Sequence, residues 1–374
     1  MKKNKIKILI IRILFGILSI ILMVTLPFLM VKEDDDFSYI YSVFVGSKSK
    51  YQGIIELWNI DSFESGSNSK SKYIEEVAKS FQKQNKGIYV LVRNLSEFEC
   101  LNLLEKGEKP DIFSCSYGIS SEIKDYILPF SNVENLDISN NFLGAGKEND
   151  KQYGLAWCYG FYTLISSENH IKKAGKEFEN INLSESALNM GYQVVGKKNT
   201  KTIYSLTYGK NKYLLPNFAF SSYTNRGLIS DLEFSLDENI KTNTQYDAYT
   251  NFLSNNSVIL LGTQRDIFRI ENRVKNGKIS NVIYQPLTTF TDLIQFSFLA
   301  KNDNSLKLEY AEIFAKMLSS SKYQSKLSSI GMLPVTGQLD VYESGIMRDV
   351  LAGSSKFENL NNVFISKSEI INLQ

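Results

Sequence analysis

Few residues of this sequence have the type and spacing that catalysis requires. The chain contains one histidine, His170, so a zinc motif built on two histidines cannot form. Neither a Cys-x-x-Cys pair nor a Gly-x-Ser-x-Gly turn occurs, and residues 144–147 match only part of a phosphate-binding loop. Ser69 and Lys72 have the Ser-x-x-Lys spacing of penicillin-binding enzymes, but the companion motifs of those enzymes are missing. The sequence therefore predicts no catalytic residue, no metal site and no cofactor.

The remaining candidates for chemistry have simpler structural interpretations. The chain has an odd number of cysteines with no short spacing between them: Cys100, Cys115 and Cys158. This pattern is typical of small buried hydrophobic residues, although two of the three could still form a disulfide. His170 lies in the polar segment 168–173, and we expect its side chain to be exposed to solvent. These residues do not indicate a reaction.

Strands and helices alternate along the chain outside its first 52 residues. Apolar runs predict strands at 54–58, 88–92, 110–114, 258–261 and 296–300, and residues at helical spacing predict helices at 73–81, 97–105, 243–253, 266–275 and 308–318. This alternation favours βαβ units and a mainly parallel sheet. Residues 176–240 show no clear pattern, and the length of the chain suggests two domains.

The charge of the chain excludes one class of partner. Six basic residues fall within 1–32, which leaves 36 Lys and Arg against 40 Asp and Glu in the rest, a formal charge of −4. A nucleic-acid-binding domain would carry a basic surface, so we expect no nucleic acid partner. A hydrophobic content of 43% is sufficient for a sizeable core.

The N-terminal segment predicts attachment to the cell membrane. Five basic residues precede the 19 uncharged residues 13–31, and an acidic run follows at 33–36. A stretch of this length spans the membrane as one helix, and the basic start keeps the N-terminus in the cytoplasm. We therefore interpret 1–32 as a single-pass anchor and 33–52 as a tether, with the large domain outside. A cleaved signal peptide is the alternative, but a small-x-small cleavage site is missing.

Five patches, in order, resemble the sugar-binding family of extracellular solute-binding proteins, which includes the maltose-binding proteins. They are the first strand and helix end at 55–58 and 81–85, the crossover at 153–157 with its continuation at 162–175, the strand at 256–262, the late helix at 311–324, and the return at 331–335. Ala156 stands where this family usually has proline, a lipoprotein cysteine does not follow the apolar run, and 176–240 matches poorly.

This resemblance implies a periplasmic-binding-protein-like fold of type II, with two α/β lobes and a ligand cleft between them. It implies one lobe at 53–157 plus 296–332 and the other at 158–295 plus 333–374. The chain would cross between the lobes near 157–161, 295–299 and 332–335, and the lobes would close over the ligand by bending there. The implied function is a monomeric substrate-binding subunit that delivers a sugar or oligosaccharide to the permease subunits of an ABC importer.

Candidate ligand-binding residues follow from the position of the expected strands and of the crossover. Ligands of open α/β sheets bind beyond the carboxyl ends of the strands. Aromatic side chains there can stack on a sugar ring, and polar side chains can bind its hydroxyl groups. The candidates are Trp58, Asp61, Phe63, Glu64, Tyr117, Trp157, Tyr159, Gln264 and Arg265.

Other functions stay open at this point. The chain could be a membrane-tethered sensor or accessory protein that is not coupled to a transporter, or it could bind a polar ligand other than a sugar. An extracellular hydrolase is a third interpretation, which the lack of an acid, base or nucleophile disfavours.

Overall fold

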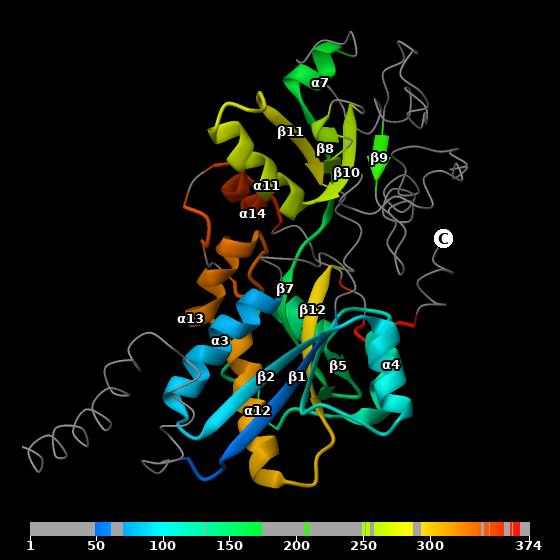
Figure 1. Cartoon of the computed structure of the whole chain (residues 1–374), viewed down its shortest axis with the longest axis vertical. Helices are drawn as coiled ribbons and strands as arrows, with labels where there is room; N and C mark the ends of the chain where they lie inside the picture. Colours follow the sequence, from blue (N-terminus) through cyan, green and yellow to red (C-terminus); the bar gives the residue numbers. More distant parts are fainter. Residues whose placement is uncertain are drawn as a thin grey trace, which may run out of the picture. The chain divides into compact units, whose positions relative to one another are not determined.

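The structure of the chain is a computed structural model (Figure 1). It describes residues 49–60, 70–131, 133–173, 206–208, 249–250, 252–254, 258–286, 293–337, 340–343, 345–354, 360 and 362–366. The expected anchor, most of the expected tether and nearly all of the segment 176–240 lie outside these residues. Within the described ranges, no helix has the length and apolar character needed to cross a membrane.

The described residues form two compact units. One contains the residues up to Ile55 together with Ala78–Leu91, and the other contains those of Glu56–Val77 together with those from Val92 onward. In the smaller unit, the N–H of Gly53 donates to the carbonyl of Gly87 at 2.9 Å, and the N–H of Val90 donates to Oε1 of Gln82 at 2.9 Å. The larger unit contains most of the remaining elements.

The first sheet has six described strands, in the order β2-β1-β3-β12-β4, with β7 paired to β12 (Figure 1). They are β1 Gly53–Ile60, β2 Ile88–Leu95, β3 Ile112–Cys115, β4 Ile127–Leu128, β7 Gly154–Tyr159 and β12 Ile294–Ala300. β1 and β3 are parallel, whereas β12 is antiparallel to β3, β4 and β7. β3, β7 and β12 are buried along their whole length, so they form the centre of the core.

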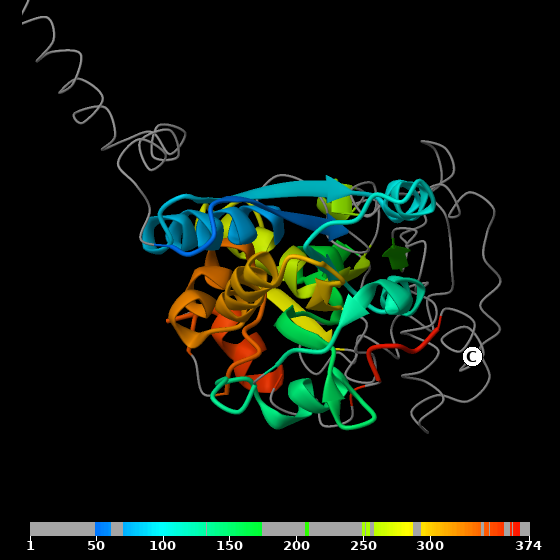
Figure 2. The same ribbon diagram turned by 90° about the horizontal axis from the view of Figure 1, so that it is seen from below.

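Helices and a short hairpin accompany this sheet. They are α3 Lys70–Gln84, α4 Glu97–Glu105, α5 Ile119–Glu122, η1 Lys124–Tyr126, α6 Asn140–Ala145, α12 Ser305–Leu318, α13 Ser321–Gln324 and η4 Ser325–Ile330, with β5 Lys147–Glu148 paired to β6 Lys151–Gln152. α12 packs against β12 and β7 (Figure 2) through buried residues that include Ala311 and Phe314. α4 begins at a capping box, in which the N–H of Ser96 donates to Oε2 of Glu99 at 2.7 Å.

The second sheet has four described strands in the order β11-β8-β10-β9. They are β8 Tyr162–Ser167, β9 Leu206–Tyr208, β10 Ile259–Thr263 and β11 Val282–Pro286, and the helices of this part are α7 Glu168–Lys173, α11 Gln264–Lys275 and α14 Ile346–Ser354. β8 is antiparallel to both β10 and β11, and β10 is parallel to β9. α11 packs on β10, on β11 and on α14.

Most expected elements are confirmed, but the mainly parallel sheet is wrong. The strands expected at 54–58, 88–92, 110–114, 258–261 and 296–300 correspond to β1, β2, β3, β10 and β12. Most described strand pairs are antiparallel. The reason is that only two residues, Gly160 and Phe161, separate β7 from β8, so the chain passes from one sheet into the other without a βαβ return.

The C-terminal segment has contacts in both parts: α14 packs on α11, and the N–H of Val363 donates to the carbonyl of Ala145 at 2.8 Å. One further expectation differs from the structure. His170 was expected at the surface, but its side chain is 5% exposed, stacks on Phe252 and hydrogen-bonds to Ser167. Polar neighbours in sequence therefore misled the interpretation of His170. The three cysteines are buried and none of them forms a disulfide, as expected.

Candidate functional site

Three segments connect the two sheets and are hydrogen-bonded to one another. We call residues 157–161 the first crossing, 293–295 the second crossing and 331–335 the third crossing. Tyr159 and Leu333 exchange two backbone hydrogen bonds of 3.0 Å, and the N–H of Gly160 donates to the carbonyl of Leu293 at 2.8 Å. The first crossing is therefore held between the other two.

Gln264, the first residue of α11, joins the first and third crossings on the side of the second sheet. Its Oε1 accepts from the N–H of Phe161 at 3.0 Å, and its Nε2 donates to the carbonyl of Gly331 at 3.2 Å. The Gln264 side chain is fully buried. A Cβ on Gly160 would lie 2.3 Å from Oε1 of Gln264, so a larger residue here would displace the Gln264 amide from its two hydrogen bonds.

Gln324, the last residue of α13, joins the same two crossings on the side of the first sheet. Its Nε2 donates to the carbonyl of Trp157 at 2.6 Å and to that of Leu318 at 2.8 Å, while its Oε1 accepts from the N–H of Val335 at 2.9 Å. This side chain is also fully buried. The two glutamines thus satisfy backbone groups that would otherwise be buried and unpaired.

A buried polar cluster lies where β1 and β3 end and β12 begins. Oγ of Ser114 accepts from Nε2 of Gln295 at 3.0 Å and from Nε1 of Trp157 at 3.3 Å, and it donates to Oδ1 of Asn59 at 3.4 Å. One hydroxyl can make these three bonds. Oε1 of Gln295 is buried and has no hydrogen-bond partner among the described residues. The cluster occupies the carboxyl ends of two parallel strands, where this type of sheet binds ligands.

The structure places both candidate tryptophans in the core of the first sheet. Trp157 is fully buried and its ring stacks on Tyr73, with centroids 5.1 Å apart and planes 7° apart. Trp58 is 1% exposed, and its Nε1 donates to Oε1 of Glu56 at 2.7 Å. Arg93 lies over the Trp58 ring at 5.5 Å from the centroid. Both rings are therefore part of the packed core of the first sheet.

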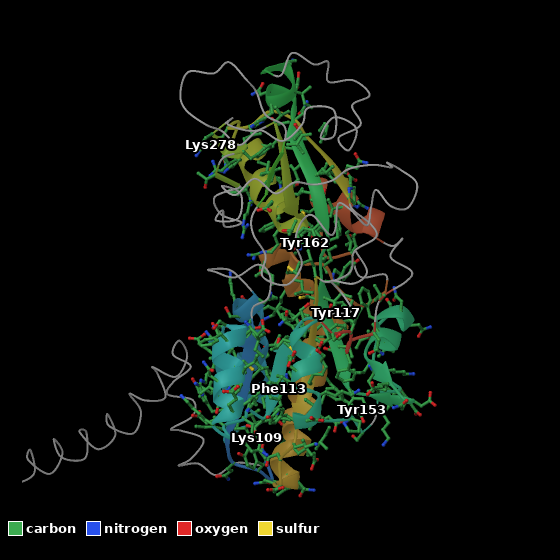
Figure 3. The ribbon with its side chains drawn as sticks, turned by 90° about the vertical axis from the view of Figure 1, so that its right-hand side faces the viewer. Lys109, Phe113, Tyr117, Tyr153, Tyr162 and Lys278 are labelled. Carbon is green, nitrogen blue, oxygen red and sulfur yellow. The ribbon has the colours of Figure 1, made fainter. Side chains whose placement is uncertain are left out.

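Tyr117 and Tyr159 lie nearer to the ends of their strands. Tyr117 follows β3 (Figure 3) and is 2% exposed, with its ring 5.5 Å from that of Phe296. Tyr159 is 7% exposed and its ring lies 4.8 Å from that of Phe142. Both aromatic side chains are packed against other rings.

The remaining candidates divide into two groups. Gln264 and Arg265 lie beside the third crossing, where Nε of Arg265 donates to the carbonyl of Ile330 at 2.8 Å. Asp61, Phe63 and Glu64 lie outside the described residues. The structure thus brings Tyr159, Gln264 and Arg265 together at the junction, with Trp157 next to Ser114.

Sequence reasoning missed Ser114, Gln295 and Gln324. Ser114 is the next-to-last residue of the short buried strand β3, and a single serine in that position gives no signal in one sequence. Gln295 lies in the strand β12, and Gln324 ends the short helix α13. Neither residue stands out from the sequence pattern of its own element. Their partners are distant along the chain, so only the folded structure shows what they bind.

Two buried tyrosines complete the junction. The hydroxyl of Tyr73 donates to the carbonyl of Leu318 at 2.6 Å, and that of Tyr342 donates to the carbonyl of Met332 at 2.9 Å. Burial raises the pKa of both phenols far above the usual value for tyrosine. Both hydroxyls therefore stay protonated donors throughout the physiological pH range.

Comparison with known proteins gives a clear result for the fold. No family model and no curated protein sequence matches the chain. Among solved structures, maltose-bound MalE3 of T. maritima aligns with a TM-score of 0.63 and 14% identity, over 83% of this chain and 90% of that one. An ABC substrate-binding protein of Listeria monocytogenes in complex with cycloalternan aligns with a TM-score of 0.58 and 12% identity, over 84% and 89%.

The chain has the fold of these oligosaccharide-binding proteins. Such neighbours are two-lobed and combine helices with strands, which agrees with the two described sheets and the three crossings between them. Sequence identities of 12% and 14% establish a shared fold. They do not transfer a ligand.

An enzyme also shares this fold. Thiaminase I from Bacillus thiaminolyticus aligns with a TM-score of 0.57 and 15% identity, over 86% of this chain and 96% of that one. In this chain, burial raises the pKa of the Cys100 thiol to about 12 and that of the Cys115 thiol well above the usual value. A thiol must lose its proton to act as a nucleophile, so neither of these cysteines is suited to attack a substrate.

Proposed function

We propose that this chain is the extracytoplasmic binding subunit of an ABC importer, and that it captures a sugar or oligosaccharide in a cleft between its two lobes. The junction carries this proposal. Three crossings joined by backbone hydrogen bonds let two lobes rotate while each keeps its packed core. In the proposal, residues 1–32 anchor the chain and hold the binding domain outside the cell.

The polar cluster at the ends of β1 and β3 supports a polar, uncharged ligand. Ser114, Asn59 and Gln295 are neutral hydrogen-bonding groups, and the two candidate tyrosines lie at neighbouring strand ends. Neutral groups match sugar hydroxyls without the cost of burying a charge. The solved relatives bind cycloalternan and maltose, which favours a carbohydrate.

Closure follows from differential affinity. A ligand that contacts both lobes binds the closed form more tightly, and this difference shifts the equilibrium toward closure. The ligand needs only to be held and released, so the proposal requires no acid, base or nucleophile. The chain would present the closed form to the permease subunits.

Thermal unfolding of the purified full chain tests the proposal. Maltotriose, mannotriose and chitotriose are suitable probes, and at roughly a hundred times its Kd a true ligand adds about 2.7 kcal/mol to the free energy of unfolding. Tyr117→Ala should reduce this stabilisation, because the ring lies at the end of β3. Phe98→Ala is a surface control, because it removes an aromatic ring that is 70% exposed on α4. Equal loss in both variants, or no stabilisation by any of the three sugars, would contradict the assignment.

A further inference from the structure

Helix α11 carries a row of like charges that the proposed sugar site does not use. Arg265, Arg269 and Arg273 are spaced four residues apart, so they lie on one face of the helix. Neighbouring charges of one sign at this spacing disfavour a helix. On the same helix, Asp266 pairs with Arg269 and Glu271 pairs with Lys275, and neither acid is among the described residues that line the cavity beside the row.

These arginines line a cavity of about 460 Å³. Lys278, which follows the helix (Figure 3), adds a fourth cation, and the other described lining residues are Tyr249, Phe268, Asn272, Asn276 and Ser329. None of the described lining residues is acidic. The cavity wall is therefore cationic, with two amides and two aromatic rings beside the charges.

The cations lie at different depths, and the two inner ones, Arg265 and Arg269, are held by polar contacts. Arg265 is 3% exposed and bonds to the carbonyl of Ile330, so it forms the inner end of the row. Nη1 of Arg269 lies 2.9 Å from Oδ1 of Asp266, which offsets one charge, and its guanidinium is 5.9 Å from the ring centroid of Tyr249. Arg273 and Lys278 are exposed at the mouth. The described lining of the cavity thus contributes four basic side chains and no acidic one.

We propose that this cavity binds a small oxyanion, a phosphate or sulfate group that is either free or esterified to a small molecule. Planar guanidinium groups match the oxygens of such anions in pairs, and ordered side chains lose less freedom when they bind. The rings of Tyr249 and Phe268 leave an apolar wall for a short carbon skeleton. The cavity is bordered by Ser329, and Arg265 bonds to Ile330 next to the third crossing, so an anion here would bind beside the junction.

Phosphate titration of the full chain tests this site. Binding of inorganic phosphate, sulfate and glucose 6-phosphate would be followed by calorimetry and by thermal unfolding, with potassium chloride keeping the ionic strength constant. The double variant Arg273→Gln, Lys278→Gln should weaken binding by roughly tenfold or more, because it removes two charge-assisted contacts at the mouth. Lys275→Gln is the control, since it removes the same charge from the same helix outside the cavity.

The possible results distinguish a free anion from a phosphate ester, and both from the absence of a site. Binding of glucose 6-phosphate alone, lost in the double variant, would assign the cavity to a phosphate ester. Binding of inorganic phosphate that is lost in the same variant would assign it to the free anion. Equal weakening by Lys275→Gln would mean general charge screening, and equal effects of phosphate and chloride would mean no site. Either of these results overturns the proposal without bearing on sugar binding.

Discussion

Gln324 and Gln264 hold the two ends of the junction in similar ways but from different sides. Each is a fully buried glutamine that joins the first crossing to the third. Gln324 ends α13, directly after α12 on the first sheet, whereas Gln264 begins α11 on the second. Each sheet is thus fixed to both crossings by its own side chain. Bending should therefore concentrate in the few residues between the two glutamine contacts, around Tyr159 and Leu333.

The largest loss of stability is expected at Trp157, where the first crossing is anchored in the core of the first sheet. Trp157→Ala removes a fully buried ring that stacks on Tyr73, so the free energy of unfolding should fall by about 3–5 kcal/mol. Denaturant unfolding measures this loss. A change below about 1 kcal/mol would show that the ring is not part of the core. The first crossing would then not be fixed to the first sheet at Trp157, and bending would not be limited to the residues around Tyr159 and Leu333.

Gln324→Ala should be the next most damaging change. It leaves the carbonyl of Trp157 and the N–H of Val335 without their partner, and each buried group left unpaired costs about 1–3 kcal/mol. Because these contacts hold the crossings to the first sheet, we expect lower stability with little change in sugar affinity per folded molecule. Denaturant unfolding measures the loss of stability, and calorimetry on the folded fraction measures the sugar affinity. A large loss of affinity at unchanged stability would contradict this purely structural role of Gln324.

Gly160 and Gln264 should show coupled effects. Gly160→Ala places a Cβ 2.3 Å from Oε1 of Gln264, and such overpacking costs about 1–3 kcal/mol. Gln264→Ala removes the atom in conflict, so the double variant should be more stable than the sum of the single losses predicts. Strict additivity in a double-mutant cycle would mean that the two residues do not share the space that the structure gives them.

The smallest effect concerns the cysteines of the first sheet. Burial raises the pKa of the Cys100 thiol to about 12 and that of the Cys115 thiol in the same direction, so both stay protonated in neutral and mildly alkaline solution. We expect no reaction with a thiol-specific disulfide reagent until the chain unfolds. The same reagent in denaturant provides the control. Rapid labelling of the native chain would show that this sheet opens more readily than its burial implies.

Local features of the fold could be predicted from sequence because their causes are local. The helix expected at 97–105 is found at Glu97–Glu105, where Ser96 and Glu99 form a capping box within four residues. The strand expected at 110–114 is found as β3 at Ile112–Cys115, between Pro110 and the polar Ser116. Hydrophobic periodicity and capping are properties of adjacent residues, so one sequence contains them.

The candidate site could be predicted only in part, because its contacts join distant segments. An aromatic residue at a strand end can face a cleft or the core, and Trp157 is buried because Tyr73, from another element, covers its ring. Gln264 was expected to bind ligand hydroxyls, but in the structure its amide bonds to Phe161 and Gly331. Single-sequence patterns identify polar and aromatic side chains at the right strand ends. They do not show what those side chains contact.

The most direct test of the account measures the distance between the two sheets with and without sugar. Spin labels at Lys109→Cys and Lys275→Cys would lie on opposite sides of the junction, at residues that are both exposed. Pulsed dipolar spectroscopy of the full chain should show a shift to shorter distances with a saturating sugar among maltotriose, mannotriose and chitotriose, and the sugar should be recovered unchanged. An unchanged distance distribution despite demonstrated binding, or a converted sugar, would contradict the account.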